Sequence, residues 1–143
     1  MQRVWSALGL VLALTAFMPR EAQSQDVRGR KAEGALRQNY PNPFNPETKI
    51  PFSVGDPPSC PDGGKQYRVT LKVYNLLSQL VKIPVVQGSA APLDNAILPC
   101  GEFIAYWDGK VLNTDREAAS GMYYYRLEVN GVALPLKKML VAK

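Results

Sequence analysis

The chain has 143 residues, with 17 lysines and arginines against 12 acidic residues, a formal charge of +5 and no histidine. This length suggests one small domain, and the missing histidine removes the commonest general base and a usual metal ligand. Basic residues are scattered, whereas nucleic-acid-binding proteins usually gather them with aromatic residues on one face. We therefore expect no nucleic-acid partner and interpret the positive balance as ordinary solvated charge.

The first 24 residues have the pattern of an export signal. Arg3 supplies the positive start, residues 4–18 are uncharged and largely apolar, and small residues precede a cleavage point between Ser24 and Gln25. A retained membrane anchor is the alternative, but this run is shorter than the roughly 20 residues needed to span a bilayer. We expect a secreted or cell-surface protein that passes through the periplasm and contacts the membrane only transiently, through its signal peptide.

Residues 25–37 are charged, contain glycine and have few large apolar side chains, a composition typical of a flexible linker. The folded domain is predicted to occupy residues 38–143. It opens with QNYPNPFNPET, in which three prolines disfavour helix and keep the backbone irregular. We expect Tyr40 and Phe44 to fold back from this segment and cover one end of the core.

From Thr48 onward, apolar side chains recur at every second position, which is the pattern of half-buried strands. Turn sequences such as Asp108-Gly109 and Asn130-Gly131 separate these stretches. The predicted fold is all-β, a small immunoglobulin-like antiparallel β-sandwich of about six or seven strands. The main strands are predicted over Thr48–Val54, 66–75, 80–86, Gly101–Trp107, Gly121–Val129 and 132–141.

The position of proline predicts the order within the sheets. Proline donates no ladder hydrogen bond, so the strands with Pro51, Pro84 and Pro135 are expected at edges or with bulges. Residues 67–75 and Gly121–Val129 contain no proline and are expected at sheet centres. The predicted structural core consists of Tyr40, Phe44, Phe52, Val69, Leu71, Val73, Trp107, Tyr123, Tyr125 and Leu127.

The two cysteines, Cys60 and Cys100, fall in loops that an up-and-down strand order would place at the same end of the domain. In an exported protein such a pair is a good disulfide candidate. The alternative is two unpaired thiols. A disulfide here would close a ring of about 40 residues and constrain loops that are rich in proline and glycine.

No enzymatic site emerges from the sequence, and we expect no catalytic residue, cofactor, small-molecule substrate or metal site. Asp108, Asp115 and Glu117 lack the spacing of a calcium-binding EF-hand, and no glycine-rich loop of the phosphate-binding type precedes a helix. The aromatic residues at 123–125 have two interpretations, a carbohydrate platform or core packing, and core packing is preferred.

Five motifs occur in a fixed order: NYPNPFNPET-x-I-x-F, V-x-L-x-VYN, YWDG, ASGMYYYRL and finally KKMLVAK. This order resembles the C-terminal sorting domain of the type IX (Por) secretion system. It is also similar to the immunoglobulin-like domain of the flagellar hook capping protein, which shares the second, third and fourth motifs. The resemblance covers residues 38–143, almost the whole of the predicted domain.

The resemblance implies a non-enzymatic immunoglobulin-like sandwich that outer-membrane secretion machinery recognises as an address. The recognised part would be the final strands, with Lys137, Lys138 and Lys143 as exposed charges around Met139. The lysines have an alternative interpretation as solubilising charge on an edge strand. The alternative function is a stand-alone structural or adhesive module that assembles with other cell-surface proteins, as hook-capping domains do.

Overall fold

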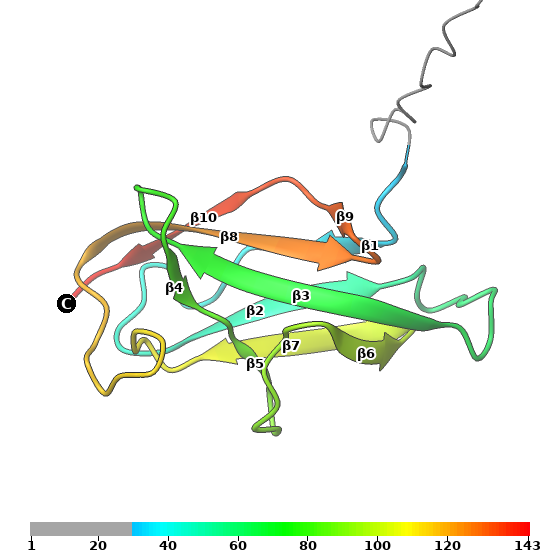
Figure 1. Cartoon of the computed structure of the whole chain (residues 1–143), viewed down its shortest axis with the longest axis horizontal. Helices are drawn as coiled ribbons and strands as arrows, with labels where there is room; N and C mark the ends of the chain where they lie inside the picture. The colour runs from blue at the N-terminus through cyan, green and yellow to red at the C-terminus, as the bar shows by residue number, and fades with distance from the viewer. Residues whose placement is uncertain (1–29) are drawn as a thin grey trace, which may run out of the picture.

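The structure, a computed structural model, describes residues 30–143, and these residues form two antiparallel sheets packed as a small β-sandwich (Figure 1). The predicted all-β fold is confirmed. The first sheet has the order β1-β2-β7-β5 and the second has the order β10-β8-β3-β4, with β6 also paired to β3 and β9 to β8. No helix long and apolar enough to cross a bilayer occurs among the described residues.

The strands are more numerous than predicted, because the chain also makes several pairings of only two to four residues. Their bounds are β1 (Gly34–Leu36), β2 (Thr48–Val54), β3 (Gln66–Tyr74), β4 (Leu80–Lys82), β5 (Val85–Val86), β6 (Ala96–Pro99), β7 (Gly101–Trp107), β8 (Gly121–Val129), β9 (Val132–Ala133) and β10 (Lys137–Val141).

Strands β3 and β8 pair at the centre of the second sheet, as their freedom from proline predicted. The hairpin after β8 is also confirmed, because Val129 pairs with Val132 across Asn130 and Gly131. Both turn residues have positive φ, 50° and 78°, the conformation that a two-residue turn of this kind requires.

The core lies between the two sheets and is built from the inward side chains of β2, β3, β7 and β8. Phe44 packs edge-on against Trp107 with ring centroids 5.3 Å apart, and Trp107 packs against Tyr123 at 5.8 Å. Such edge-to-face pairs add to the stabilisation from burial. The predicted core residues that are buried are Phe44, Phe52, Val69, Leu71, Val73, Trp107, Tyr123, Tyr125 and Leu127.

Tyr40 is the exception, and its prediction as a core residue was wrong: its side chain is 46% exposed. The main-chain N–H and C=O of Tyr40 both hydrogen-bond Lys49 at 2.9 Å. Residues directly opposite one another in a ladder place their side chains on the same face. Lys49 is an outward residue of β2, so Tyr40 also points outward.

The predicted linker at residues 25–37 overlaps the folded domain, which corrects the boundary drawn at residue 38. Strand β1 pairs with β2 through Gly34 and Val54 at one end and Leu36 and Phe52 at the other. Leu36 is buried, and its short strand GAL was missed because three residues carry too little periodicity to be recognised. The predicted cleavage point at Ser24 and Gln25 lies outside the described residues.

Pro51 was predicted to mark an edge strand or a bulge, and this was wrong, because β2 lies between β1 and β7 and pairs with both in regular register. The carbonyl of Pro51 accepts a hydrogen bond from the Arg37 N–H, just beyond the end of β1. The nitrogen of Pro51 therefore faces a side where the partner strand has already ended. A central strand tolerates proline here because no ladder donor is required at that position.

Residues 80–86, predicted as one strand, divide between the two sheets. Strand β4 pairs with β3 in the second sheet, and β5 pairs with β7 in the first. The chain passes between the sheets at Ile83 and at Pro84, whose carbonyl accepts a hydrogen bond from Leu93 instead of joining a ladder. Pro84 and Pro135 were predicted to lie within strands, and this was wrong, because Pro84 lies between β4 and β5 and Pro135 lies between β9 and β10.

The predicted disulfide between Cys60 and Cys100 is present, with the two Cα atoms 5.9 Å apart. It joins the loop after β2 to the residue between β6 and β7. The side chain of Cys100 packs against the core, next to Gly55 and Tyr67. The disulfide thus ties the proline-rich loop at residues 55–65 to the end of the sandwich.

Candidate recognition surface

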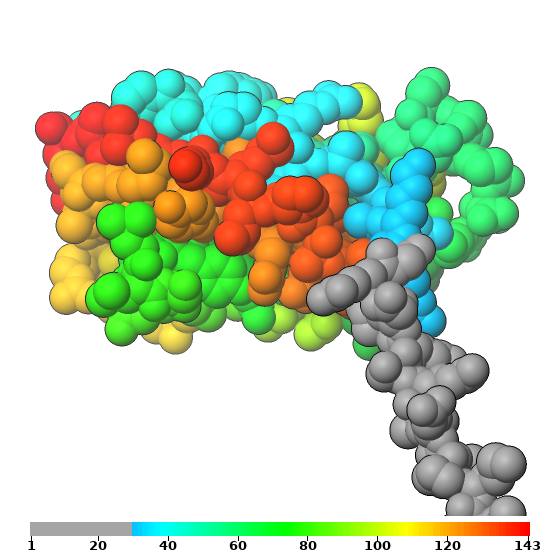
Figure 2. Space-filling view, turned by 90° about the horizontal axis from the view of Figure 1, so that it is seen from above, coloured from blue at the N-terminus to red at the C-terminus, as the bar shows by residue number. Residues whose placement is uncertain are grey.

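Strand β10 has a neighbour on each of its two sides. In Figures 1 and 2, β10 is red, strand β8 is orange and the proline-rich segment is cyan. One side pairs with β8 from Lys137 opposite Tyr125 to Val141 opposite Gly121. The other side contacts the proline-rich segment at residues 42–44. β10 is therefore an integral strand of the second sheet.

Two backbone hydrogen bonds from Phe44 close the outer side of β10. The Phe44 N–H donates to the Leu140 carbonyl at 3.0 Å, and the Phe44 carbonyl accepts from the Ala142 N–H at 3.1 Å. Phe44 can make both bonds because its own side chain is buried against Trp107, which fixes its backbone beside the strand.

Two amide side chains complete the closure. Asn42 Oδ1 accepts a hydrogen bond from the Leu140 N–H at 3.0 Å, and Gln38 Nε2 donates to the Lys138 carbonyl at 2.8 Å. Neither contact could be predicted from the sequence, because an asparagine or glutamine near a proline is as typical of a local turn as of a long-range contact. The addition of a partner strand at this part of β10 would require the segment to leave.

The predicted recognition residues do not form one cluster. Lys138 is exposed on the outer face of the second sheet, opposite Tyr124, whereas Lys137 is half-buried opposite Tyr125. Lys143 is exposed and makes an ion pair with Glu117 at 3.4 Å. In the part of the chain that the structure describes, neither Lys137 nor Lys138 forms an ion pair.

Met139 was predicted to belong to the recognised surface, and this was wrong, because its side chain is 1% exposed. Alternate side chains of a strand point to opposite faces. Met139 lies opposite Tyr123, an inward residue of β8, so it packs into the core. The outward residues of β10 are Lys138 and Leu140.

The third motif is fixed beside the first by a close backbone approach. A Cβ atom added to Gly109 would lie 1.9 Å from the Pro46 carbonyl oxygen, and Gly109 has a φ of 80°. Asp108 Oδ1 accepts a hydrogen bond from the Lys110 N–H at 3.0 Å, and Trp107 Nε1 donates to the Lys110 carbonyl at 2.9 Å. Only glycine therefore fits between the tryptophan turn and the proline-rich segment.

Tyr125 links the fourth motif to the start of the domain. Its buried hydroxyl donates to the Arg37 carbonyl at 2.8 Å and accepts from the Asn39 N–H at 3.0 Å. Desolvation by burial raises the pKa of Tyr125 to about 12, against a smaller opposing effect of the bond from Asn39. The neutral phenol is therefore the form that the folded protein holds at ordinary pH.

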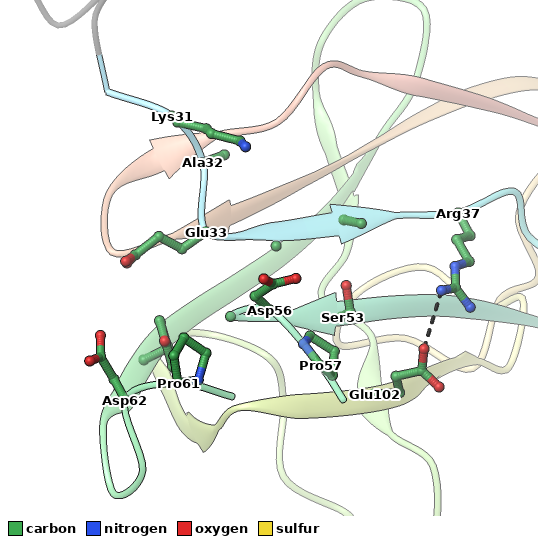
Figure 3. A pocket seen from close by; sticks show the side chains of 14 residues that line it. Lys31, Ala32, Glu33, Arg37, Ser53, Asp56, Pro57, Pro61, Asp62 and Glu102 are labelled. Carbon is green, nitrogen blue, oxygen red and sulfur yellow. Dashed lines mark hydrogen bonds and ion pairs between the residues drawn. The ribbon is translucent and has the colours of Figure 1, made fainter. Parts of the chain in front are cut away.

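A separate groove of about 570 Å³ lies between β1 and the loop that follows β2 (Figure 3). Three of its charged side chains are paired, since Arg37 pairs with Glu102 at 3.2 Å and Glu33 pairs with Lys65 at 2.7 Å. The hydrogen bond from Lys65 lowers the pKa of Glu33. Asp56 and Asp62 also line it, from separate parts of the loop.

Among the residues that line the groove, no hydrogen bond joins the Ser53 or Tyr67 hydroxyl to another side chain. Among residues 30–143, no group of three or more histidine, cysteine, aspartate or glutamate side chains is placed to hold a metal ion. We take β10 and its neighbours, which carry the predicted recognition residues, as the candidate recognition surface.

Comparisons with known proteins identify no relative for this chain. No protein-family model, no curated protein and no solved structure matches it.

Proposed function

We propose that this protein is an exported, non-enzymatic domain of the type IX sorting kind, which secretion machinery recognises through its folded last strands. The observation that carries the proposal is the convergence of the motifs at one end of the sandwich. Phe44 of the first motif contacts Trp107 of the third, which contacts Tyr123 of the fourth. The main chain of Phe44 also hydrogen-bonds Leu140 and Ala142, which belong to the fifth motif.

This convergence supports recognition of a folded surface instead of a linear tail. β10 is paired on both sides, so its main chain is already occupied where Phe44 and Asn42 bind it. What remains available to a partner is the exposed side chains, among them Lys138 and Lys143. Lys143 already pairs with Glu117, so the positive charge of Lys138 is the one that favours an acidic partner surface and speeds the encounter with it.

The test is the export of a reporter inserted between residues 29 and 30, which keeps β1 in the domain. We expect the reporter outside the outer membrane in a host with type IX machinery and in the periplasm of a matched host lacking it. Equal distribution in the two hosts would contradict the sorting proposal. It would favour the alternative of a structural or adhesive surface module, for which the exposed apolar side chains of the second sheet are the supporting observation.

A further inference from the structure

The outer face of the second sheet carries a concentration of exposed apolar side chains at one end. Among residues 30–143, eight large apolar residues are exposed, and seven of them lie on this face or at the adjoining β3–β4 turn. Six of the seven, all except Ile97, gather at the end next to that turn. We call these six residues, together with Tyr74 and Tyr124, the apolar patch. The six are Leu76, Leu77, Leu80, Met122, Leu136 and Leu140.

Strand pairing places these side chains side by side. Tyr124 lies opposite Tyr74 on one side and Lys138 on the other, Tyr74 lies opposite Leu80, and Met122 lies opposite Leu140. In Figure 2 the green β3–β4 turn lies beside the orange strand β8, next to the orange-red chain that leads to β10. The patch is therefore continuous across β4, β3, β8 and β10.

A shallow hollow of about 350 Å³ opens within the patch. Tyr74, Tyr124, Arg126 and Leu136 line it, with Asn75 and Ser78 from the turn. The Arg126 guanidinium lies over the Tyr74 ring, 5.9 Å from its centroid, and keeps an ion pair with Glu128 at 3.5 Å. Tyrosine, methionine and arginine at such a surface are the residue types enriched in protein–protein interfaces.

The charge around the patch is mostly positive. Lys72, Arg126 and Lys138 are outward residues of β3, β8 and β10, respectively. Glu128 is the one carboxylate among the outward residues of these three strands, and Arg126 already pairs with it. A complementary partner would therefore carry carboxylates beside its apolar side chains.

We propose that the apolar patch binds an apolar segment of another protein that carries acidic residues beside its apolar side chains. A second copy of this chain is a poor occupant, because a two-fold contact would bring the same lysines together. An anionic bilayer fits the charge, but only Leu76 and Leu77, in the turn, are more than 60% exposed, which leaves little apolar surface to insert. This inference does not depend on export.

The test is a selection of random 15-residue displayed peptides on the immobilised full chain. We expect enrichment of peptides in which leucine, isoleucine or phenylalanine stands next to aspartate or glutamate. Leu136→Asp should weaken their binding at least roughly tenfold, as for a residue at an interface centre. Ile97→Asp is the matched control, because Ile97 is also 53% exposed on the same sheet but lies outside the patch; its binding should change less than about twofold.

Charge reversal provides a second measurement. The double variant Lys72→Glu, Lys138→Glu should weaken the binding of the selected peptides by a larger factor at low salt than at high salt, because salt screens exposed charges. Absence of enriched peptides, enrichment of peptides without acidic residues, or equal loss in Leu136→Asp and Ile97→Asp would overturn the proposal. The proposal would also be overturned if the protein bound phosphatidylserine vesicles or associated with itself and Leu136→Asp abolished that binding. Such a result would assign the patch to a membrane or to a second copy of the chain.

Discussion

Phe44 donates its main-chain N–H to the carbonyl of Leu140 at 3.0 Å, so a residue of the proline-rich segment closes the outer side of the last strand. An open edge strand is a template for pairing with other chains. Here the closing segment is fixed by the packing of the Phe44 ring against Trp107. The arrangement makes the stability of this end of the sandwich depend on one aromatic side chain.

Phe44→Ala should therefore lower the free energy of unfolding by about 3–5 kcal/mol, the usual loss for a buried phenylalanine. Tyr40→Ala, in the same segment, should lower it by less than about 1 kcal/mol because Tyr40 is 46% exposed. Urea unfolding of both variants measures the difference. Equal losses would mean that the Phe44 ring does not hold the segment.

Gly109→Ala should be more destabilising than Gly64→Ala, although both glycines have positive φ, 80° and 86°. Nothing lies within 4 Å of a Cβ at Gly64, so that change should cost only the conformational strain, about 1–2 kcal/mol. At Gly109 the new atom would also clash with the Pro46 carbonyl, and we expect a loss of about 3 kcal/mol or more. Similar melting temperatures for the two variants would contradict the close approach.

Reduction of the disulfide should lower stability by about 4 kcal/mol, the chain-entropy value for a ring with a sequence separation of 40. Thermal unfolding with and without a phosphine reductant measures this effect. The double variant Cys60→Ser with Cys100→Ser is the control, and its melting temperature should not respond to the reductant. An unchanged wild-type melting temperature would show that the bond contributes nothing.

Alkaline pH should destabilise the protein through Tyr125. In the unfolded chain a tyrosine loses its proton near pH 10, whereas in the folded protein burial raises the pKa of Tyr125 to about 12. Between these values the folded state binds more protons, so stability falls as pH rises, by about 2–3 kcal/mol in total.

The variant Tyr125→Phe should show a shallower loss over the same pH range in urea titrations. Tyr106 contributes in the same direction in both proteins, because the hydrogen bond to Glu47 and burial raise its pKa to about 12. Parallel pH profiles for the wild-type protein and Tyr125→Phe would exclude this role for the Tyr125 hydroxyl.

Much of the fold could be predicted because alternation is a strong pattern wherever one face of a strand is buried. The predicted bounds of β2, β7 and β8 agree with the structure, and their inward residues are the alternating apolar positions of each strand. The disulfide could be predicted because an up-and-down strand order places the loops that hold Cys60 and Cys100 at the same end of the domain. These features depend on local sequence and on simple connectivity.

The predictions were wrong where long-range contacts determine which way a side chain points or which strands pair. Met139 packs inward and Tyr40 points outward because of their partners Tyr123 and Lys49, and these registers are not visible in the sequence. Strand β1 is too short to show a period. Residues 80–86 divide between two sheets because β4 pairs with β3 and β5 pairs with β7, and these pairings are not visible in the sequence. For the candidate recognition surface, the sequence predicted three exposed lysines, of which Lys137 is half-buried. The sequence did not indicate the closure of β10 by Gln38, Asn42 and Phe44.

The proposal that the folded last strands are the recognised address is tested most directly by the location of the reporter inserted between residues 29 and 30. Removal of residues 137–143 is a poor test, because it deletes β10 itself. Charge reversal of the exposed residues Lys138 and Lys143 to glutamate keeps the strand, with Arg68→Glu as a matched exposed control outside it. The account predicts export of the wild-type and Arg68→Glu reporters and periplasmic retention of a folded Lys138→Glu, Lys143→Glu reporter. Equal export of all three would contradict it.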